Sequence, residues 1–329
     1  MWSNIVDAKS IAKRATWLGC RVALPLLLAL LSLGFVTTST GHASPSAPLL
    51  PAAVSSQRAD SAPVMEEFNG VLYIGWTGRN GAHNLNLMAY NPSTSSFSAA
   101  QVLTDTTIVG AGPSLSNFYN NLYVAWLGTD HRLNVGRYNM ANPSVLANKV
   151  TLDEHSTNAP ALTGFNGRLY LSWRGTDGRL NLMSSVDGST FGSKITYIAA
   201  LKTSPSLVSA NMYMLVFWEE MNVNSNIVVG RYDPQNPMNL NPLVTLASTS
   251  QLPVGVAQAG VPEPYARIAW RTGSDAHIRL GLYESSSFIH NPVYTTQTTP
   301  YTPTLFNGAY LCWTGTDAAQ SVNVASIHL

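Results

Sequence analysis

Four aspartates recur at the same place in a repeated pattern, and arginines accompany them. Each aspartate follows a Gly-Thr or Gly-Ser pair, two of the arginines come two residues after such an aspartate, and two others directly follow a tryptophan. Carboxylates accept hydrogen bonds and guanidinium groups donate them in a planar fork, which suits sugar hydroxyls or a ligand carboxylate. The pattern predicts these ligand-binding residues: Asp130, Arg132, Arg174, Asp177, Arg179, Arg271, Asp275 and Asp317.

A structural role competes with this prediction. An aspartate in a Gly-Thr-Asp turn commonly accepts hydrogen bonds from its own backbone. An active site is usually asymmetric, so repetition also argues against catalysis. Equivalent loops suit multivalent binding instead, because several weak sites add up through effective concentration.

Motifs for metal or cofactor chemistry are missing from the sequence. The seven histidines are scattered without His-x-x-x-His spacing, and the two cysteines, Cys20 and Cys312, lie far apart. No Gly-x-Ser-x-Gly, P-loop or dinucleotide fingerprint occurs. We therefore expect neither a metal nor a cofactor.

The candidate residues belong to a repeat that also determines the fold. Its clearest copy runs from Phe165 to Asn181, FNGRLYLSWRGTDGRLN. Six tryptophans mark the register at intervals of 43 to 52 residues: Trp76, Trp126, Trp173, Trp218, Trp270 and Trp313. Such a period is typical of propeller blades. Within each copy, alternating apolar residues and turn signals predict four antiparallel strands. The sequence predicts an all-β, six-bladed β-propeller.

The ends of the chain predict how the ring closes. The sixth copy stops after its third strand, at VNVASIHL. The segment Leu49–Pro63 resembles the fourth strand and following loop of the other copies. We expect residues near Leu50–Ser55 to supply the missing strand, which removes an exposed sheet edge. An open array or a degenerate seventh blade is the alternative.

Four glutamates break the repeat. Glu219 and Glu220 replace the glycine turn of blade four, and Glu66 and Glu67 lie in the innermost strand of blade one, where one of them can face the central channel. A glycosidase needs two carboxylates about 5–10 Å apart. Blades one and four are opposite in a six-fold ring, so Glu66 and Glu220 should be too far apart. Glu219 and Glu220 remain weak catalytic candidates.

The N-terminus has the features of a secretory signal. Lys9, Lys13, Arg14 and Arg21 precede the apolar run Val22–Val36, and small residues follow. We expect residues 1–43 to be a signal peptide, 44–48 a linker and 49–329 the propeller. An uncleaved N-terminal membrane anchor is the alternative.

The composition of the mature chain excludes some partners. Removal of residues 1–43 takes away four of 18 basic and one of 17 acidic residues, which leaves a net charge near −2. That charge argues against a nucleic-acid partner. With only Cys312 left, no intramolecular disulfide is possible.

One turn carries a family resemblance. SVDGSTF, Ser185 to Phe191, resembles the Asp-box (Ser-x-Asp-x-Gly-x-Thr-Trp) of sialidase-type propellers, with the glycine displaced to Gly188. YNPSTSSF, ending at Phe97, is a looser equivalent. The resemblance implies a sialidase-like six-bladed propeller in which the Asp-box is structural. Catalytic members also carry an Arg-Ile-Pro-type motif early in the chain, which is absent here, so no catalytic residue is transferred.

Together these patterns favour a secreted, non-catalytic propeller that binds carbohydrate at the Gly-Thr-Asp loops. The expected partner is a glycan or another extracellular molecule, with no membrane span in the mature chain. Two alternatives stay open: a sialidase-like glycoside hydrolase with diverged catalytic residues, and a protein–protein interaction scaffold.

Overall fold

The computed structural model describes residues 52–210, 212–222, 224–246, 254–258, 265–272, 275–284 and 287–327. The chain divides into Met1–His42 and a compact unit, Ala43–Leu329, and all described residues lie in the second unit. Every regular element in the described residues is a β-strand. The predicted signal peptide and linker lie outside the described residues, so those boundaries stay predictions.

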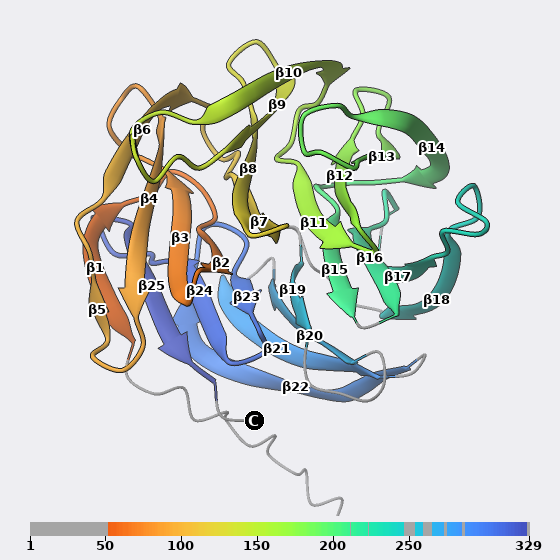
Figure 1. Cartoon of the computed structure of the whole chain (residues 1–329). Coiled ribbons are helices and arrows are strands. Elements are labelled where there is room, and N and C mark those ends of the chain that lie inside the picture. Colours follow the sequence, from red (N-terminus) through yellow and green to blue (C-terminus); the bar gives the residue numbers. More distant parts are fainter. Residues whose placement is uncertain are drawn as a thin grey trace, which may run out of the picture. The chain divides into compact units, whose positions relative to one another are not determined.

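The strands form six antiparallel sheets arranged as blades around a ring (Figure 1). Blades one to three comprise, in chain order, β2 (Val64–Phe68), β3 (Val71–Thr77), β4 (Asn84–Asn91), β5 (Ser96–Phe97), β6 (Gln101–Thr106); β7 (Ser114–Phe118), β8 (Asn121–Leu127), β9 (Arg132–Arg137), β10 (Ala147–His155); and β11 (Ala161–Phe165), β12 (Arg168–Arg174), β13 (Arg179–Ser185), β14 (Gly192–Ala200). In blade one the outermost strand is broken, and β5 and β6 both pair with β4.

Blades four to six repeat this order. They comprise β15 (Ser206–Ala210), β16 (Tyr213–Glu219), β17 (Ile227–Tyr232), β18 (Asn241–Leu246); β19 (Gly255–Gln258), β20 (Tyr265–Arg271), β21 (His277–Glu284), β22 (Ser287–Thr298); and β23 (Thr304–Phe306), β24 (Tyr310–Thr314), β25 (Ser321–Ser326). The six-bladed propeller predicted from the repeat is confirmed.

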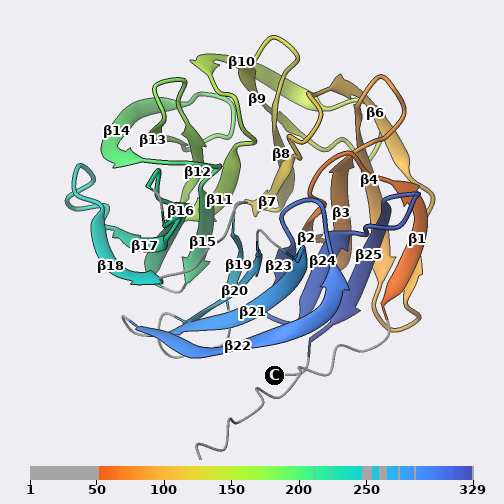
Figure 2. The same ribbon diagram turned by 180° about the vertical axis from the view of Figure 1, so that it is seen from behind.

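An N-terminal strand closes the ring, as predicted. β1 (Ala53–Arg58) pairs antiparallel with β25, with Ala53 opposite Val324 and Val54 opposite Asn323. Blade six therefore has the order β1-β25-β24-β23, and β1 lies beside β25 in both views (Figures 1 and 2). The strand extends to Arg58, three residues beyond the predicted range. The segment that leads into blade one is thereby hydrogen-bonded into blade six, which closes the ring and covers the edge of β25.

The tryptophans fill the seams between blades. All six are 5% exposed or less. Each lies in a different apolar cluster; Trp173, for example, packs with Tyr123 and Ala125 of the preceding blade. Apolar burial of this kind is the dominant stabilising contribution, at about 25 cal/mol per Å². One blade cannot cover its own faces, so the seams hold the ring together.

The two ends of the propeller carry different connections. In an antiparallel meander, the second-to-third-strand connections share one end with the blade-to-blade loops; we call it the Asp-turn end. The hairpins between the first and second strands share the other end with the third-to-fourth-strand connections; we call it the Asn-turn end. The innermost strands β2, β7, β11, β15, β19 and β23 contact one another in sequence around the axis.

Candidate functional site

The repeated aspartates hold their own turns. Oδ1 of Asp130 accepts the backbone N–H of Arg132 at 3.1 Å, and Oδ1 of Asp177 accepts that of Arg179 at 3.0 Å. Asp275 and Asp317 accept the N–H groups of His277 and Ser321 in the same way. Blades one and four use Asn80 and Asn222 at this position, with equivalent bonds. The turn needs an oxygen acceptor, and the negative charge is not required for its geometry.

Two further residues complete each turn. The Asn134 amide donates to the carbonyl of Arg132 at 3.0 Å, and the Asn181 amide does the same to Arg179 at 3.1 Å. The aspartate and asparagine side chains lie directly over the glycine that starts the turn: a Cβ on Gly128 would stand 2.6 Å from Oδ1 of Asp130. The Gly-x-Asp…Asn pattern is therefore explained by packing and hydrogen bonding. The four aspartates nevertheless stay exposed. Oδ2 of Asp275 accepts a hydrogen bond from Arg279 and Oδ2 of Asp317 accepts one from Ser321, so in the described residues only Asp130 and Asp177 keep an outer oxygen without a hydrogen bond.

The predicted arginines occupy different surroundings. Nε of Arg174 donates to the Leu201 carbonyl at 2.7 Å and Nη1 to Thr157 at 3.1 Å, so this side chain joins two blade-to-blade loops. Nε of Arg132 donates to the Leu152 carbonyl at 3.0 Å. Arg179 is exposed, 3.9 Å from Oδ2 of Asp177, and Arg271 ends β20. The first two arginines thus have structural contacts, and Arg179 is the most accessible for a ligand.

The side chains of Glu219 and Glu220 lie in different surroundings. The Glu219 side chain is buried, with Oε1 3.1 Å from Nζ of Lys202. Burial raises its pKa, and the hydrogen bond and charge of Lys202 oppose that rise. Glu220 instead accepts a hydrogen bond from the Asn222 amide at 2.7 Å, within its own turn. The weak catalytic candidates are thus one buried ion-pair member and one turn residue.

The structure distributes the predicted residues around the ring. Asp130, Asp177, Asp275 and Asp317 lie in four different blades, and their hydrogen bonds are made within their own turns. A binding role for the eight predicted residues remains a prediction of several separate sites, one per blade.

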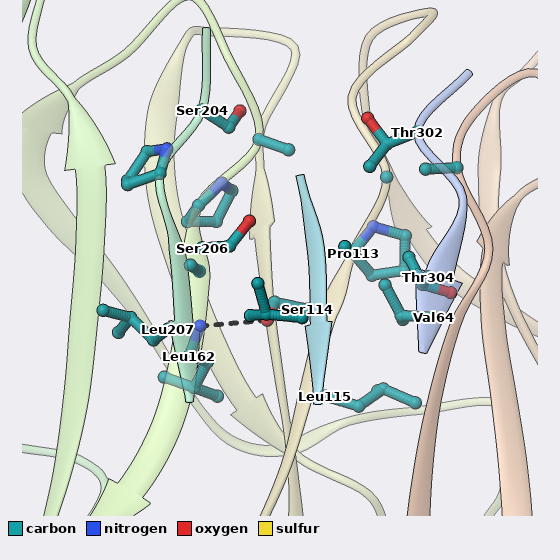
Figure 3. Close-up of a pocket in the computed structure, with 18 of the residues that line it drawn as sticks. Val64, Pro113, Ser114, Leu115, Leu162, Ser204, Ser206, Leu207, Thr302 and Thr304 are labelled. Carbon is teal, nitrogen blue, oxygen red and sulfur yellow. Dashed lines mark hydrogen bonds between the residues drawn. The ribbon is translucent and has the colours of Figure 1, made fainter. Parts of the chain in front are cut away.

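A central cavity of about 630 Å³ lies on the axis of the propeller. The innermost strands and the blade-to-blade loops line it, and Figure 3 shows Ser114, Ser206 and Thr304 around it. Ser114 accepts the Leu162 N–H at 2.9 Å, and Thr304 donates to the Pro63 carbonyl at 2.6 Å, so these hydroxyls join neighbouring inner strands. Among the described lining residues, Glu66 is the only charged one. Burial raises the pKa of Glu66 to about 7.

A second cavity, of about 740 Å³, lies between blades six and one at the Asn-turn end. We call it the seam hollow. Its aromatic lining consists of Tyr90, Phe97, Phe306 and Tyr310, and its polar lining includes Glu67, Asn91 and Asn307. Tyr90 packs against Phe97 with ring centroids 5.1 Å apart and against Tyr310 at 6.4 Å. Phe97, Phe306 and Tyr310 are only partly buried.

Sequence reasoning did not single out the seam hollow. Tyr310 occupies the same strand position as Tyr73, Tyr123 and Tyr170, which all lie three residues before the register tryptophan. At the seam between blades one and two, Tyr73 packs against Tyr138 at 5.5 Å. A tyrosine repeated at this position predicts a contact across every seam. It does not predict that the seam beside Tyr310 contains a cavity.

The SVDGSTF turn connects β13 and β14, in the predicted place. Oδ1 of Asp187 accepts the backbone N–H groups of Ser189 at 2.8 Å and Thr190 at 2.7 Å. The Ser185 hydroxyl donates to the same carboxylate at 2.8 Å. The backbone hydrogen bonds hold the pKa of Asp187 well below its ordinary value. The turn is a self-contained structural unit, and its membership in the Asp-box family stays a resemblance.

In the described part of the chain, no helix has the length and apolar character needed to cross a membrane. Nor do three or more His, Cys, Asp or Glu side chains of the described residues gather where they could hold a metal ion.

Comparison with known proteins identifies the fold. No protein-family model matches the chain, and no curated protein matches it in sequence. Solved structures do match. The SapL1 lectin, in complex with α-methyl fucoside, superposes with a TM-score of 0.61 at 11% identity, covering 82% of this chain and 94% of the lectin. The Aleuria aurantia lectin, in complex with a fucosyl-N-acetylglucosamine, gives 0.55 at 9%, covering 84% and 97%.

A sialidase from Trypanosoma rangeli is also similar, with a TM-score of 0.57 at 10% identity, covering 82% of this chain and 55% of the sialidase. The similarity to a sialidase and to lectins agrees with the propeller architecture that the Asp-box resemblance implied. At these identities the likeness concerns the fold.

Proposed function

We propose that this protein is a secreted, non-catalytic propeller that binds carbohydrate. The observation that carries the proposal is the seam hollow, where partly exposed aromatic rings lie beside a carboxylate and amides. Apolar sugar faces pack on aromatic rings, and sugar hydroxyls bond to carboxylate and amide groups. Pockets of this size with a few polar groups among aromatic residues are usual for small ligands.

The polar groups of the seam hollow are available for a ligand. Glu67 is exposed, and its carboxylate forms no hydrogen bond or ion pair with the described residues. The Tyr310 hydroxyl and the Asn307 amide likewise have no hydrogen-bond partner there. A Cβ on Gly70 would find no atom within 4 Å, so the wall of the hollow is open beside this residue. A sugar entering the hollow would satisfy these groups without displacing an existing bond.

The Asp turns provide further sites in the same proposal. Asp130, Asp177, Asp275 and Asp317 hold exposed carboxylates at equivalent positions. Their turns keep them rigid, which lowers the entropy lost on binding. The lectin neighbours support glycan binding, because two of them are described with fucosides. The expected partner is therefore an extracellular glycan, bound by the seam hollow and by several weaker sites at the opposite end.

The central cavity favours binding over hydrolysis. A glycosidase needs two carboxylates that flank one bond. Among the described residues that line the cavity, Glu66 is the only carboxylate, and neither Glu219 nor Glu220 lines it. The hydrolase alternative is tested with a fluorogenic sialoside and aryl glycosides, and turnover of any of them would contradict the non-catalytic proposal.

The seam hollow is tested by calorimetry with methyl glycosides of fucose, galactose, mannose and N-acetylglucosamine. We expect Glu67→Gln to weaken binding of the best ligand about tenfold, because a charge-assisted hydrogen bond is lost. Tyr310→Ala should abolish binding at this site. Tyr73→Phe, at the equivalent position of the first seam, is the matched control and should leave affinity unchanged. Unaltered binding in Glu67→Gln and Tyr310→Ala would reject the seam hollow as the site.

The Asp turns are tested with two substitutions that separate charge from structure. Asparagine keeps the turn acceptor, as Asn80 and Asn222 show, and removes the charge. If carboxylates bind the glycan, Asp130→Asn with Asp177→Asn should lower avidity on a glycan array while unfolding stays unchanged. If the aspartates are only structural, the asparagine variants should change neither glycan avidity nor the free energy of unfolding. Alanine at the same positions should then lower the free energy of unfolding by about 1 kcal/mol per turn.

The proposed secretion is tested on the full-length chain, expressed with an intact secretory pathway. Mass spectrometry of the product should give an N-terminus near Ser44. A chain that keeps Met1 and stays with the membrane fraction would instead support the anchored alternative.

A further inference from the structure

The central cavity has a chemical asymmetry that the six-fold repeat does not require. A proline precedes each of the six inner strands in the sequence: Pro63, Pro113, Pro160, Pro205, Pro253 and Pro303. The third residue after each proline lines the central cavity, and the equivalent positions in the repeat place these residues at one level of its wall. In ring order these residues are Glu66, Ser116, Thr163, Val208, Val256 and Phe306. Three neighbouring blades therefore present polar groups, and the opposite three present apolar groups. The cavity at this level has one polar wall and one apolar wall.

The level two residues earlier has a different pattern and a structural explanation. Its residues alternate between apolar and hydroxyl-bearing around the ring: Val64, Ser114, Ala161, Ser206, Val254 and Thr304. Each hydroxyl bonds to the next inner strand: Ser114 to Leu162, Ser206 to Val254 and Thr304 to Pro63. Alternation thus serves the joining of blades, and Figure 3 shows one of these bonds, from Leu162 to Ser114. At the later level Ser116 also bonds to the next blade, at Gly164, and Val208 and Val256 pack in the seam between blades four and five, so joining of the blades accounts for part of the two-wall pattern. It does not account for an acidic side chain in the cavity wall, and Glu66 beside hydroxyl groups points to a cationic ligand with an apolar body.

Glu66 is the charged group of the polar wall. Its Oε1 accepts the Glu67 N–H at 3.2 Å, and its carboxylate also accepts the backbone N–H of Asn117 on β7. The titratable groups around it are Glu67 on its own strand and Tyr73, which lies opposite in register on β3. The cavity lining from β7 and β23 is uncharged in the described residues. No lysine or arginine of that lining neutralises Glu66, so its charge is left for a ligand to balance.

The neighbouring polar groups also have spare capacity. The Ser116 hydroxyl accepts the Gly164 N–H at 3.0 Å and keeps a second lone pair. The Thr163 hydroxyl forms no hydrogen bond with the described residues. Carboxylate and hydroxyl oxygens together are acceptors for the three N–H donors of an ammonium group.

We propose that the central cavity is a second binding site, which takes a small organic cation. Its ammonium group contacts Glu66, Ser116 and Thr163, and its hydrocarbon body packs against Val208, Val256 and Phe306. The cavity, at about 630 Å³, is in the usual size range for small-molecule sites. The proposal does not depend on the carbohydrate proposal, although Phe306 also lines the seam hollow.

Cyclohexylamine and cyclohexanol provide a matched pair of probes, because they share a ring and differ in charge. We expect calorimetry at pH 8 to show one molecule of cyclohexylammonium bound per chain, with cyclohexanol at least about tenfold weaker. Glu66→Gln should weaken the ammonium about tenfold and leave cyclohexanol unchanged. Glu67→Gln, one residue away, should leave ammonium binding unchanged. Val208→Thr should weaken both probes, because it adds a hydroxyl to the apolar wall.

The pH dependence gives a second readout. The pKa of Glu66 is raised to about 7, so the carboxylate forms as pH rises through that value. The amine, with a pKa near that of lysine at about 10.4, stays protonated between pH 6 and 8. Affinity should therefore rise from about pH 6 to about pH 8 in the wild type and stay flat in Glu66→Gln. Without ligand, stability should fall as pH rises from about 4.5 to about 7, because in that range the folded chain keeps the Glu66 proton that the unfolded chain has lost, and it should level off above about pH 7.

Absence of ammonium binding at millimolar concentration would overturn the proposal. So would equal binding of the two probes, or ammonium binding that Glu66→Gln does not weaken. Sugar binding weakened about tenfold in Glu67→Gln, with ammonium binding unchanged, is the result expected if the two cavities are separate sites.

Discussion

Two connections at the Asn-turn end, the SVDGSTF turn of blade three and the YNPSTSSF turn of blade one, face equivalent tyrosines of their preceding blades and make different contacts with them. In blade three, Asp187 organises the turn, and its carbonyl accepts the Tyr123 hydroxyl of blade two at 3.1 Å. In blade one, Asn91 accepts only the Ser93 N–H at 3.0 Å from the turn backbone. The tyrosine it faces, Tyr310 of blade six, has no hydrogen-bond partner among the described residues.

The difference shows where a repeat protein makes room for a ligand. Gly188 lies so close to the Tyr123 ring that a Cβ would stand 2.3 Å from a ring carbon, so this seam is filled. The connection in blade one leaves the seam hollow beside Tyr310. The well-formed turn therefore closes a seam, and the degenerate turn opens one.

Gly188→Ala should destabilise the protein far more than Gly70→Ala. Both glycines have a positive φ, +73° and +72°, which disfavours a side chain. That backbone effect alone costs about 1 kcal/mol. Gly188→Ala adds a clash with the Tyr123 ring, for a total of about 3 kcal/mol. Urea unfolding of the two variants measures the difference, and equal losses would show that the seam at blade three is not filled.

Tyr123→Phe should lower the free energy of unfolding by about 1 kcal/mol, because it removes the hydrogen bond to Asp187. Tyr310→Phe should change it by less than about 0.5 kcal/mol, since no hydrogen bond is lost among the described residues. Calorimetry with methyl glycosides should show the opposite order, with weaker sugar binding in Tyr310→Phe only. A stability loss in Tyr310→Phe as large as that in Tyr123→Phe would contradict the contrast.

Asp187→Ala should remove a small acid-dependent part of the stability. The pKa of Asp187 lies well below the ordinary value of 3.8, so the carboxylate stabilises the folded chain above about pH 4. That contribution is lost as pH falls below about 4 toward the folded pKa. Between about pH 4 and pH 2, the Tm of the wild type should therefore fall more steeply than that of Asp187→Ala. Asn91→Ala, in the turn of blade one, changes no titratable group and should keep the wild-type slope.

The number and order of the blades follow from the amino-acid sequence. Trp76 to Trp313 recur at a nearly constant interval, each beside alternating apolar residues, and local periodicity of that kind leaves few ways to bury every face. The repeat also predicted closure by β1, because its sixth copy lacks a fourth strand. The structural role of Asp177 in its own turn could also be predicted, as the alternative to ligand binding, since an Asx turn depends only on residues next to it in the chain.

Which side chains meet across a seam or around the axis follows only from the folded arrangement of the blades. Tyr310 and Tyr73 have equivalent local sequences and pack against equivalent tyrosines, Tyr90 and Tyr138, yet Tyr310 borders the seam hollow and Tyr73 does not, because the neighbouring blade supplies the difference. Glu66 and Glu67 are adjacent in sequence and line two different cavities, because successive side chains of a strand point to opposite faces. Contacts of this kind depend on how far the blades rotate around the ring, which no single repeat encodes.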